Sequence, residues 1–105
     1  MKEVSVQELK QKMDSNEDFQ LIDIRESYEI EIASLNGEHM PMAGIMNFTD
    51  KIRTDVPVII HCRSGQRSAA VVNALEQQLK LDNLYNLKGG ILAWAEEIDQ
   101  SMEKY

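Results

Sequence analysis

The sequence predicts an α/β domain with a mainly parallel central sheet and helices on both faces. Three observations support this fold class. The consecutive β-branched residues Val58–Ile60 are typical of a strand buried on both faces, as in the centre of a parallel sheet. A second short apolar run lies at Phe19–Ile24. Segments with apolar residues at helical spacing alternate with these runs, a pattern typical of parallel α/β architecture.

The remaining elements can be assigned in order along the chain. Ser5, followed three residues later by Glu8, fits a capping box and predicts a helix to about Asp14. For the short helical segment expected at Glu26–Ala33, the residues Tyr28, Ile32 and Leu35 are expected to face inward. The other expected elements are one or two helical turns over Glu26–Ala33, a short strand at His39–Met40, a helix within Ile45–Ile52, a strand at Val56–His61, a helix from Ser68 to about Lys80, a strand at Asn83–Leu87 and a last amphipathic helix after Gly89–Gly90.

Length and composition limit the kind of protein. The 105 residues suit one domain spanning 1–105, and 43% apolar with 28% charged residues is typical of a globular chain. Eleven basic against eighteen acidic side chains give a net charge of −7. An acidic chain with a pI of about 4.7 argues against nucleic acid as a partner. No apolar run approaches the roughly 20 residues of a membrane span, so no membrane association is expected.

The single cysteine, Cys62, cannot form an internal disulfide. The N-terminal residues lack the apolar core of a signal peptide, and together these features favour a reducing cytoplasm. The other soft metal ligands are only His39 and His61, so we expect no metal and no organic cofactor. No long apolar patch is visible in the sequence, and a monomer is expected.

The position of Cys62 indicates a reactive thiol. It directly follows the most clearly predicted strand and precedes a helix, where parallel α/β folds bind ligands. Gly65 allows a positive φ, so that successive backbone N–H groups can point inward and stabilise an anion. Arg63 and Arg67 add positive charge nearby. These features should lower the pKa of Cys62 and favour the nucleophilic thiolate. A buried structural cysteine, the alternative, has no reason to lie among such polar residues.

Three segments of the sequence resemble the rhodanese domain family. The stretch His61–Ser68 is similar to the family's active-site loop. Leu21–Glu26, followed by Tyr28 and Glu29, is similar to its first conserved strand, and Asn86–Ile91 with Trp94 is similar to its C-terminal glycine pair and tryptophan. The resemblance implies a rhodanese-like three-layer sandwich. The sequence departs from the family pattern at Gly37–Gly44, where it keeps a histidine and a proline but separates Gly37 from His39.

The resemblance implies a sulfurtransferase. Cys62 would take the outer sulfur of a donor such as thiosulfate, hold it as a persulfide and pass it to a nucleophilic acceptor. Backbone N–H groups of the loop would hold the charge of that sulfur; the loop residues are Arg63, Ser64, Gly65, Gln66, Arg67 and Ser68. Four residues separate Cys62 from Arg67, whereas the related dual-specificity phosphatases have five for a wider phosphate ring. The count favours sulfur over phosphate.

The C-terminal stretch Gly89–Ala95, with Lys104 and Tyr105, resembles one subgroup of the family. These rhodanese domains are attached to E1-like enzymes that adenylate sulfur-carrier proteins. The resemblance therefore implies a protein persulfide as a further donor, and a sulfur-carrier protein, an adenylyltransferase or a cysteine desulfurase as partners.

Supporting roles are expected for several charged residues. Arg67 is expected to organise the loop through backbone carbonyls or Glu26, and Arg63 either steers an anionic donor or is simply solvated. Asp23 lies in a buried strand and needs a partner, either the loop N–H groups or Arg25. Arg25, at the end of that strand, either reaches the pocket or pairs with Glu26 or Glu29. Strand alternation points His61 away from Cys62.

Three alternatives to a sulfurtransferase enzyme remain open at this point. The first is a persulfide carrier in a sulfur relay, with little turnover of small molecules. The second is a phosphatase or arsenate reductase, and the third is an inactive interaction domain, against which the intact Cys62 argues.

Overall fold

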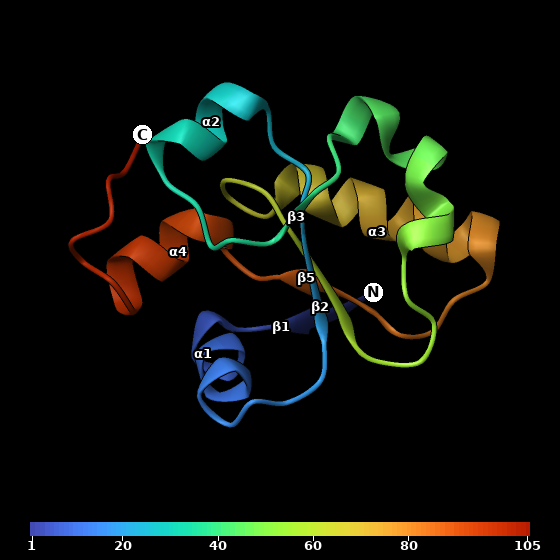
Figure 1. Ribbon diagram of the computed structural model, residues 1–105, viewed down its shortest axis with the longest axis horizontal. Helices are drawn as coiled ribbons and strands as arrows, with labels where there is room; N and C mark the ends of the chain where they lie inside the picture. Colours follow the sequence, from blue (N-terminus) through green and yellow to red (C-terminus); the bar gives the residue numbers. More distant parts are fainter.

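The computed structural model describes residues 1–105 as five parallel strands with helices on both sides (Figure 1). The strand order is β1-β5-β4-β2-β3. The strands are β1 (Lys2–Val4), β2 (Gln20–Asp23), β3 (Glu38–His39), β4 (Val58–His61) and β5 (Leu84–Leu87), and the helices are α1 (Val6–Asp14), α2 (Ser27–Ile32), the 3₁₀ helix η1 (Met42–Lys51), α3 (Gln66–Leu79) and α4 (Gly90–Glu97). The predicted fold class is confirmed.

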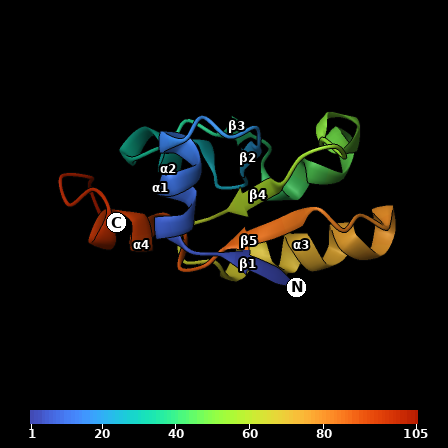
Figure 2. The ribbon, with the colours of Figure 1, turned by 90° about the horizontal axis from the view of Figure 1, so that it is seen from below.

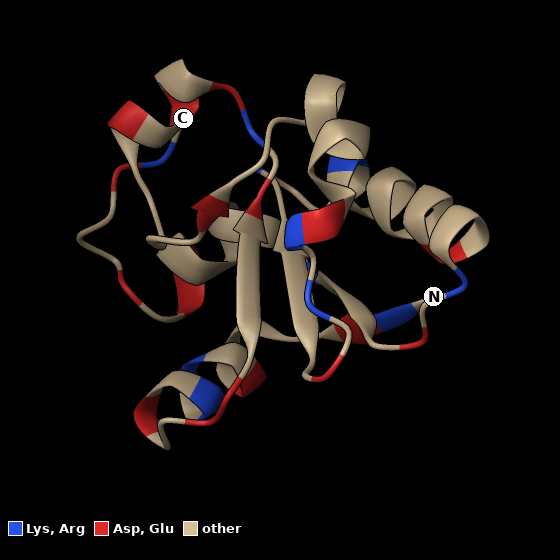
Figure 3. Cartoon of the chain, turned by 45° about the vertical axis from the view of Figure 1, so that its right-hand side comes forward, with Lys and Arg blue, Asp and Glu red and all other residues tan.

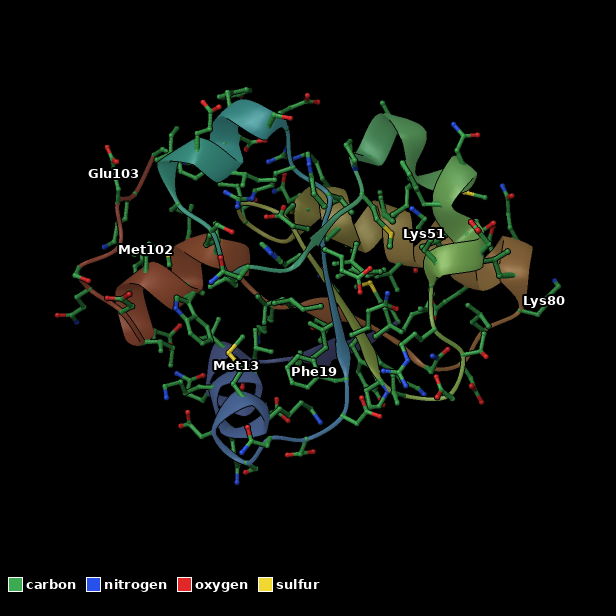
Figure 4. The ribbon with its side chains drawn as sticks, in the orientation of Figure 1. Met13, Phe19, Lys51, Lys80, Met102 and Glu103 are labelled. Atoms are coloured by element: carbon green, nitrogen blue, oxygen red, sulfur yellow. The ribbon has the colours of Figure 1, made fainter.

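The central strand β4 is buried over all four residues, as its β-branched sequence predicts. Its alternating side chains enter two separate cores. Ile60 and Cys62 belong to the core under η1 and α3, whereas Ile59 belongs to the core under α1 and α4. Met13 and Phe19 pack against the second core (Figure 4). Helices therefore cover both faces of the sheet, and Cys62 lies on the α3 side.

Most boundaries agree with the sequence to within two residues. The helix α1 begins with the predicted capping box, in which Ser5 and Glu8 exchange hydrogen bonds. The helix α3 begins at Gln66, two residues before the predicted start, and the segment expected to be a helix within 45–52 is the longer 3₁₀ helix η1. None of the helices is long and apolar enough to cross a lipid bilayer.

One strand was not predicted, and one expectation about a helix was wrong. The short strand β1 pairs with β5 at the edge of the sheet (Figure 2), although its polar sequence carries no strand pattern. In α2, Tyr28 is 65% exposed, and Glu29 is buried in its place. A carboxylate tolerates burial when charged or polar donors surround it, and Glu29 has such donors.

The parallel arrangement brings the carboxyl ends of three strands together. Asp23 of β2 lies opposite His61 of β4, and Ile60 of β4 lies opposite Asn86 of β5. The loops that leave these strands therefore meet at one edge of the sheet. The C-terminus reaches the same edge and lies beside α2 (Figure 1).

Candidate active site

Cys62 follows β4 directly, and its side chain is only 1% exposed. The loop after it turns at Gly65, whose φ of 101° is in the left-handed region, as the sequence predicted. Gly65 also caps the start of α3. This turn brings the chain back over the sulfur: Sγ accepts hydrogen bonds from the backbone N–H groups of Gly65 at 3.1 Å and Ser68 at 3.4 Å, and the Ser68 hydroxyl lies 3.3 Å away.

This environment favours the anionic form of the sulfur. Burial by itself raises the pKa of Cys62, but the hydrogen bonds that the Ser68 hydroxyl and the N–H groups of Ser68, Gly65 and Ser64 can donate to the thiolate outweigh it and lower the pKa below that of an ordinary thiol. Lowering the pKa of a thiol raises its thiolate fraction near neutral pH. The geometry thus supports a nucleophilic cysteine.

Helix α4 holds the loop from behind. The N–H groups of Ile91 and Leu92 donate to the carbonyl oxygens of Cys62 and Arg63 at 3.1 and 3.0 Å. In a trans peptide the N–H points away from the carbonyl, so the held carbonyl of Arg63 directs the N–H of Ser64 away from α4, and this N–H interacts with Cys62. The contact is so close that Gly90, with a φ of 61°, has no room for a side chain.

Arg67 closes the other side of the loop through an ion pair with Glu29 of α2. Its two terminal nitrogens donate to the two carboxylate oxygens at 2.9 and 2.8 Å. The backbone N–H of Glu26 also donates to Glu29, at 2.8 Å. Both partners expected for Arg67 were therefore wrong. Its side chain donates to Glu29 and not to backbone carbonyls, and the Glu26 side chain is exposed.

Asp23 and Arg25 form a second, fully buried ion pair. Arg25 is fully buried and donates from Nε and Nη2 to the Asp23 carboxylate at 3.0 and 2.7 Å. Of the partners considered for Asp23, Arg25 is confirmed. The expectation that Arg25 forms an ion pair with Glu26 or Glu29 was wrong, because its charged partner is Asp23. The other contacts of the guanidinium are the Tyr105 hydroxyl and the backbone carbonyls of Ala33 and Glu29.

His61 lies on the Asp23 side of β4, with Nε2 3.5 Å from that carboxylate. Burial lowers the pKa of His61 despite the neighbouring Asp23, so the ring is neutral near pH 7. The prediction that it points away from Cys62 is confirmed by the alternation of β4.

Tyr105 contacts both the Arg67–Glu29 pair and the Asp23–Arg25 pair. Its hydroxyl donates to Glu29 at 3.0 Å and accepts from Arg25 at 2.8 Å. Its ring lies against Arg63, whose guanidinium carbon is 5.2 Å from the ring centroid, and its carbonyl oxygen accepts from Arg63. The remaining predicted loop residues, Ser64 and Gln66, are exposed. Arg63 is therefore held by Tyr105 rather than free in solvent.

Asn86, Glu29 and Tyr105 lie in segments that resemble the family, but none of them was predicted to be a site residue. A usable signal existed for Asn86, a polar residue within a predicted strand, since such a residue needs a hydrogen-bond partner wherever the strand is buried. Asn86 is 2% exposed and contacts both Ser68 and the loop carbonyl of Gly65. The subgroup resemblance included Tyr105, but nothing in the sequence predicted its contact with Arg25, which only the fold brings about.

The sequence and the fold were compared with those of known proteins. The sequence profile of the family described as "Rhodanese-like domain" matches residues 5–97. The chain belongs to this family. A crystal structure of a rhodanese-like domain protein from Staphylococcus aureus superposes with a TM-score of 0.83 at 30% identity, covering 100% of this chain and 99% of that one.

Two curated members of the rhodanese-like family are named for sulfur transfer. A sulfurtransferase of Allochromatium vinosum is 37% identical, over 89% of this chain and 87% of its own length. A probable adenylyltransferase/sulfurtransferase, MoeZ, of Mycobacterium tuberculosis is 29% identical over 97% of this chain. The chain spans 38% and 26% of the first two curated relatives that it matches, so those proteins contain much that this chain does not represent.

The Arg67–Glu29 pair predicts a pH dependence of stability. The hydrogen bonds from Arg67 lower the pKa of Glu29 to about 2, against an ordinary value of 4.5. The ionised carboxylate therefore stabilises the fold above pH 4.5, and this contribution is lost as pH falls through about 2. Urea unfolding of the wild type and Glu29→Gln should show a constant difference in stability above pH 4.5 that shrinks at lower pH.

The matched control is Glu31→Gln, an exposed position on the same helix. Its stability should follow that of the wild type at every pH. A Glu29→Gln difference that does not change with pH would contradict the assigned ion pair.

Proposed function

We propose that this protein is a sulfurtransferase that moves a sulfane sulfur from a donor to a nucleophilic acceptor through a persulfide on Cys62. One observation carries the proposal: the sulfur of Cys62 accepts hydrogen bonds from backbone N–H groups of a loop at the start of a helix. Such a loop stabilises negative charge on sulfur, both before transfer and after it. The names of the relatives support the same chemistry.

Two displacements make up the proposed reaction. With thiosulfate as donor, the Cys62 thiolate forms a bond to the outer sulfur, the bond from that sulfur to the SO₃ group breaks, and sulfite leaves with the electron pair. The product is the persulfide anion of Cys62. An acceptor nucleophile then attacks the outer sulfur, and Sγ leaves as the thiolate. Cyanide as acceptor gives thiocyanate, so the cycle needs no oxidant, reductant or metal.

The loop residues have distinct parts in this proposal. The N–H groups of Gln66 and Arg67, in the first turn of α3, have no partner within the helix and are available to the outer sulfur. Arg67 keeps the loop closed through Glu29. Arg63 adds positive charge beside the nucleophile and attracts an anionic donor. Asp23, Arg25 and the Glu26 backbone act indirectly, because they hold Glu29 and Tyr105 in place.

A small anion suits the loop better than a phosphate ester. Four residues separate Cys62 from Arg67, and the N–H groups already lie on Sγ itself. A phosphatase loop must instead surround a tetrahedral group beyond the sulfur. The narrow loop therefore favours the transfer of one sulfur atom.

A persulfide carrier in a protein relay is the second candidate. The 1% exposure of Cys62 favours it, since a buried sulfur is poorly accessible to small molecules until the site opens. The similarity to MoeZ, whose name joins adenylyltransferase and sulfurtransferase, and to a putative sulfur carrier protein of Bacillus subtilis supports an adenylyltransferase or a sulfur-carrier protein as the partner class. In that case the natural donor is a protein persulfide.

Steady-state turnover tests the proposal. Wild-type protein should convert thiosulfate and cyanide to thiocyanate, Cys62→Ser should have no activity, and neither should hydrolyse p-nitrophenyl phosphate. Slow turnover with a readily loaded Cys62 would favour the relay over the small-molecule enzyme. Hydrolysis of the phosphate ester by the wild type but not by Cys62→Ser would overturn the sulfurtransferase proposal.

A further inference from the structure

Asn86 is a buried polar residue of β5 whose side chain lies beneath the Cys62 loop. Its Nδ2 group donates to the carbonyl oxygen of Gly65 at 3.1 Å, and its Oδ1 accepts from the hydroxyl of Ser68 at 2.5 Å. Because the Gly65 carbonyl can only accept, it must face the amide nitrogen of Asn86. The orientation of the Asn86 amide is therefore fixed, and its oxygen faces Ser68.

This orientation determines the position of one hydrogen. A serine hydroxyl has a single hydrogen, and the short contact with Asn86 Oδ1 places that hydrogen on the Asn86 side. The contact of 3.3 Å between Ser68 Oγ and Cys62 Sγ then needs its hydrogen from the sulfur. The thiol thus donates to Ser68, and Ser68 donates to Asn86, in a chain that is buried throughout.

Ionisation of Cys62 changes this series of hydrogen bonds. A thiolate has no hydrogen to donate, so the Ser68 hydroxyl must rotate its hydrogen from Asn86 to the sulfur. Asn86 Oδ1 then loses its partner in a site without exposure to solvent, which costs free energy. The hydroxyl of Ser68 can therefore stabilise the thiolate only at the expense of Asn86.

We propose that Asn86 is a positioning residue that holds the hydroxyl hydrogen of Ser68 and so keeps the thiolate fraction of Cys62 below the value that the loop N–H groups alone would give. The inference rests on the proposed function in taking Cys62 as the nucleophile, and it adds the regulation of that nucleophile. The backbone N–H groups of Gly65 and Ser68 favour the anion, whereas Asn86 opposes it. The balance between them sets the thiolate fraction.

The charged groups around Cys62 do not titrate in the range where the thiol does. Arg67 of α3 is paired with Glu29 of α2, and the pKa of Glu29 is about 2. Burial raises the pKa of Tyr105, which contacts Arg63 of the loop, above the ordinary 10. Behind the loop, burial keeps His61 of β4 neutral beside the Asp23–Arg25 pair. A titration between pH 6 and pH 9 therefore follows Cys62 itself.

Alkylation of Cys62 by iodoacetamide across this pH range tests the proposal, because the chain has one cysteine and the intact mass reports it alone. The midpoint of the rate against pH gives the pKa of the thiol, whatever its accessibility. Asn86→Val should lower the midpoint and Ser68→Ala should raise it, each by about one unit, or tenfold in thiolate below the midpoint.

The double variant separates positioning from general loosening of the loop. Asn86→Val also removes the bond to Gly65, and that loss is the same with or without the Ser68 hydroxyl. If Asn86 acts through Ser68, then Asn86→Val should not lower the midpoint in the Ser68→Ala background. A rise in the midpoint for Asn86→Val alone, or an equal fall in both backgrounds, would overturn the proposal.

A second measurement does not depend on the folding of any Asn86 variant. The infrared S–H stretching band of the wild type at pH 5 belongs to Cys62 alone. It should lie below the frequency of a free thiol and move upward in Ser68→Ala. A wild-type band at the free-thiol frequency would overturn the proposal. Neither measurement uses a sulfur donor, so a protein that fails to accept sulfur leaves these outcomes unaffected.

Discussion

Gly90→Ala is expected to destabilise the protein by about 2–5 kcal/mol, as the sum of a left-handed alanine and an overpacked contact. Gly90 has a φ of 61°, and a Cβ there would lie 2.6 Å from the carbonyl carbon of Arg63 and 2.7 Å from the carbonyl oxygen of Cys62. These neighbours are backbone atoms held by Ile91 and Leu92. They cannot yield without moving the Cys62 loop, so sulfur transfer should be lost together with stability.

Urea unfolding measures the change, with the fluorescence of the buried Trp94 as the probe, since it is the only tryptophan. Gly44→Ala is the matched control. Its added Cβ would meet only a Phe48 ring atom at 3.8 Å, and its φ is not positive. Gly44→Ala should leave stability nearly unchanged. An equal effect at both glycines would show that the close contact of α4 with the loop is not what holds the site.

Asp23→Asn is expected to cost about 3–5 kcal/mol, because it leaves the buried guanidinium of Arg25 without its counter-charge. Asp23 is 1% exposed, Arg25 is fully buried, and three nitrogens of Arg25 donate to this one carboxylate. The loss should extend to the site, because Arg25 also orients Tyr105, which contacts Glu29.

Asp55→Asn provides the control for Asp23. Asp55 also pairs with an arginine, Arg53, at 2.9 Å, but its side chain is 68% exposed. An exposed pair contributes less than about 1 kcal/mol. The charge change is the same at both positions, so urea unfolding of the two variants isolates the effect of burial. Equal losses would contradict the assignment of Asp23–Arg25 as a buried pair that supports the site.

The sequence predicted well what local patterns determine. The β-branched run of β4 and the adjoining Cys62 loop are contiguous in sequence, so strand, nucleophile, turn and helix start could be assigned together. Gly65 was expected to have a positive φ and does. The acidic composition is also visible in the structure, where Asp and Glu lie on elements all around the fold (Figure 3).

The features that the sequence did not predict depend on contacts between residues far apart in the chain. The strand β1 has three residues, two of them exposed, and only pairing with β5 makes it a strand. An apolar pattern favours Tyr28 over Glu29 as the inward residue of α2, yet Arg67 and Tyr105 supply donors that make burial of Glu29 favourable. Tyr105 and Arg25 are brought together across nearly the whole chain, and no local pattern predicts such a pair.

The central claim is that Cys62 accepts and holds a sulfur atom. Its most direct test is the intact mass of the protein after incubation with thiosulfate, and separately with a cysteine desulfurase and cysteine, beside Cys62→Ser. We expect the wild type to gain the mass of one sulfur atom, to lose it on addition of cyanide, and Cys62→Ser to gain nothing. A wild-type mass that stays unchanged with both donors would contradict the account.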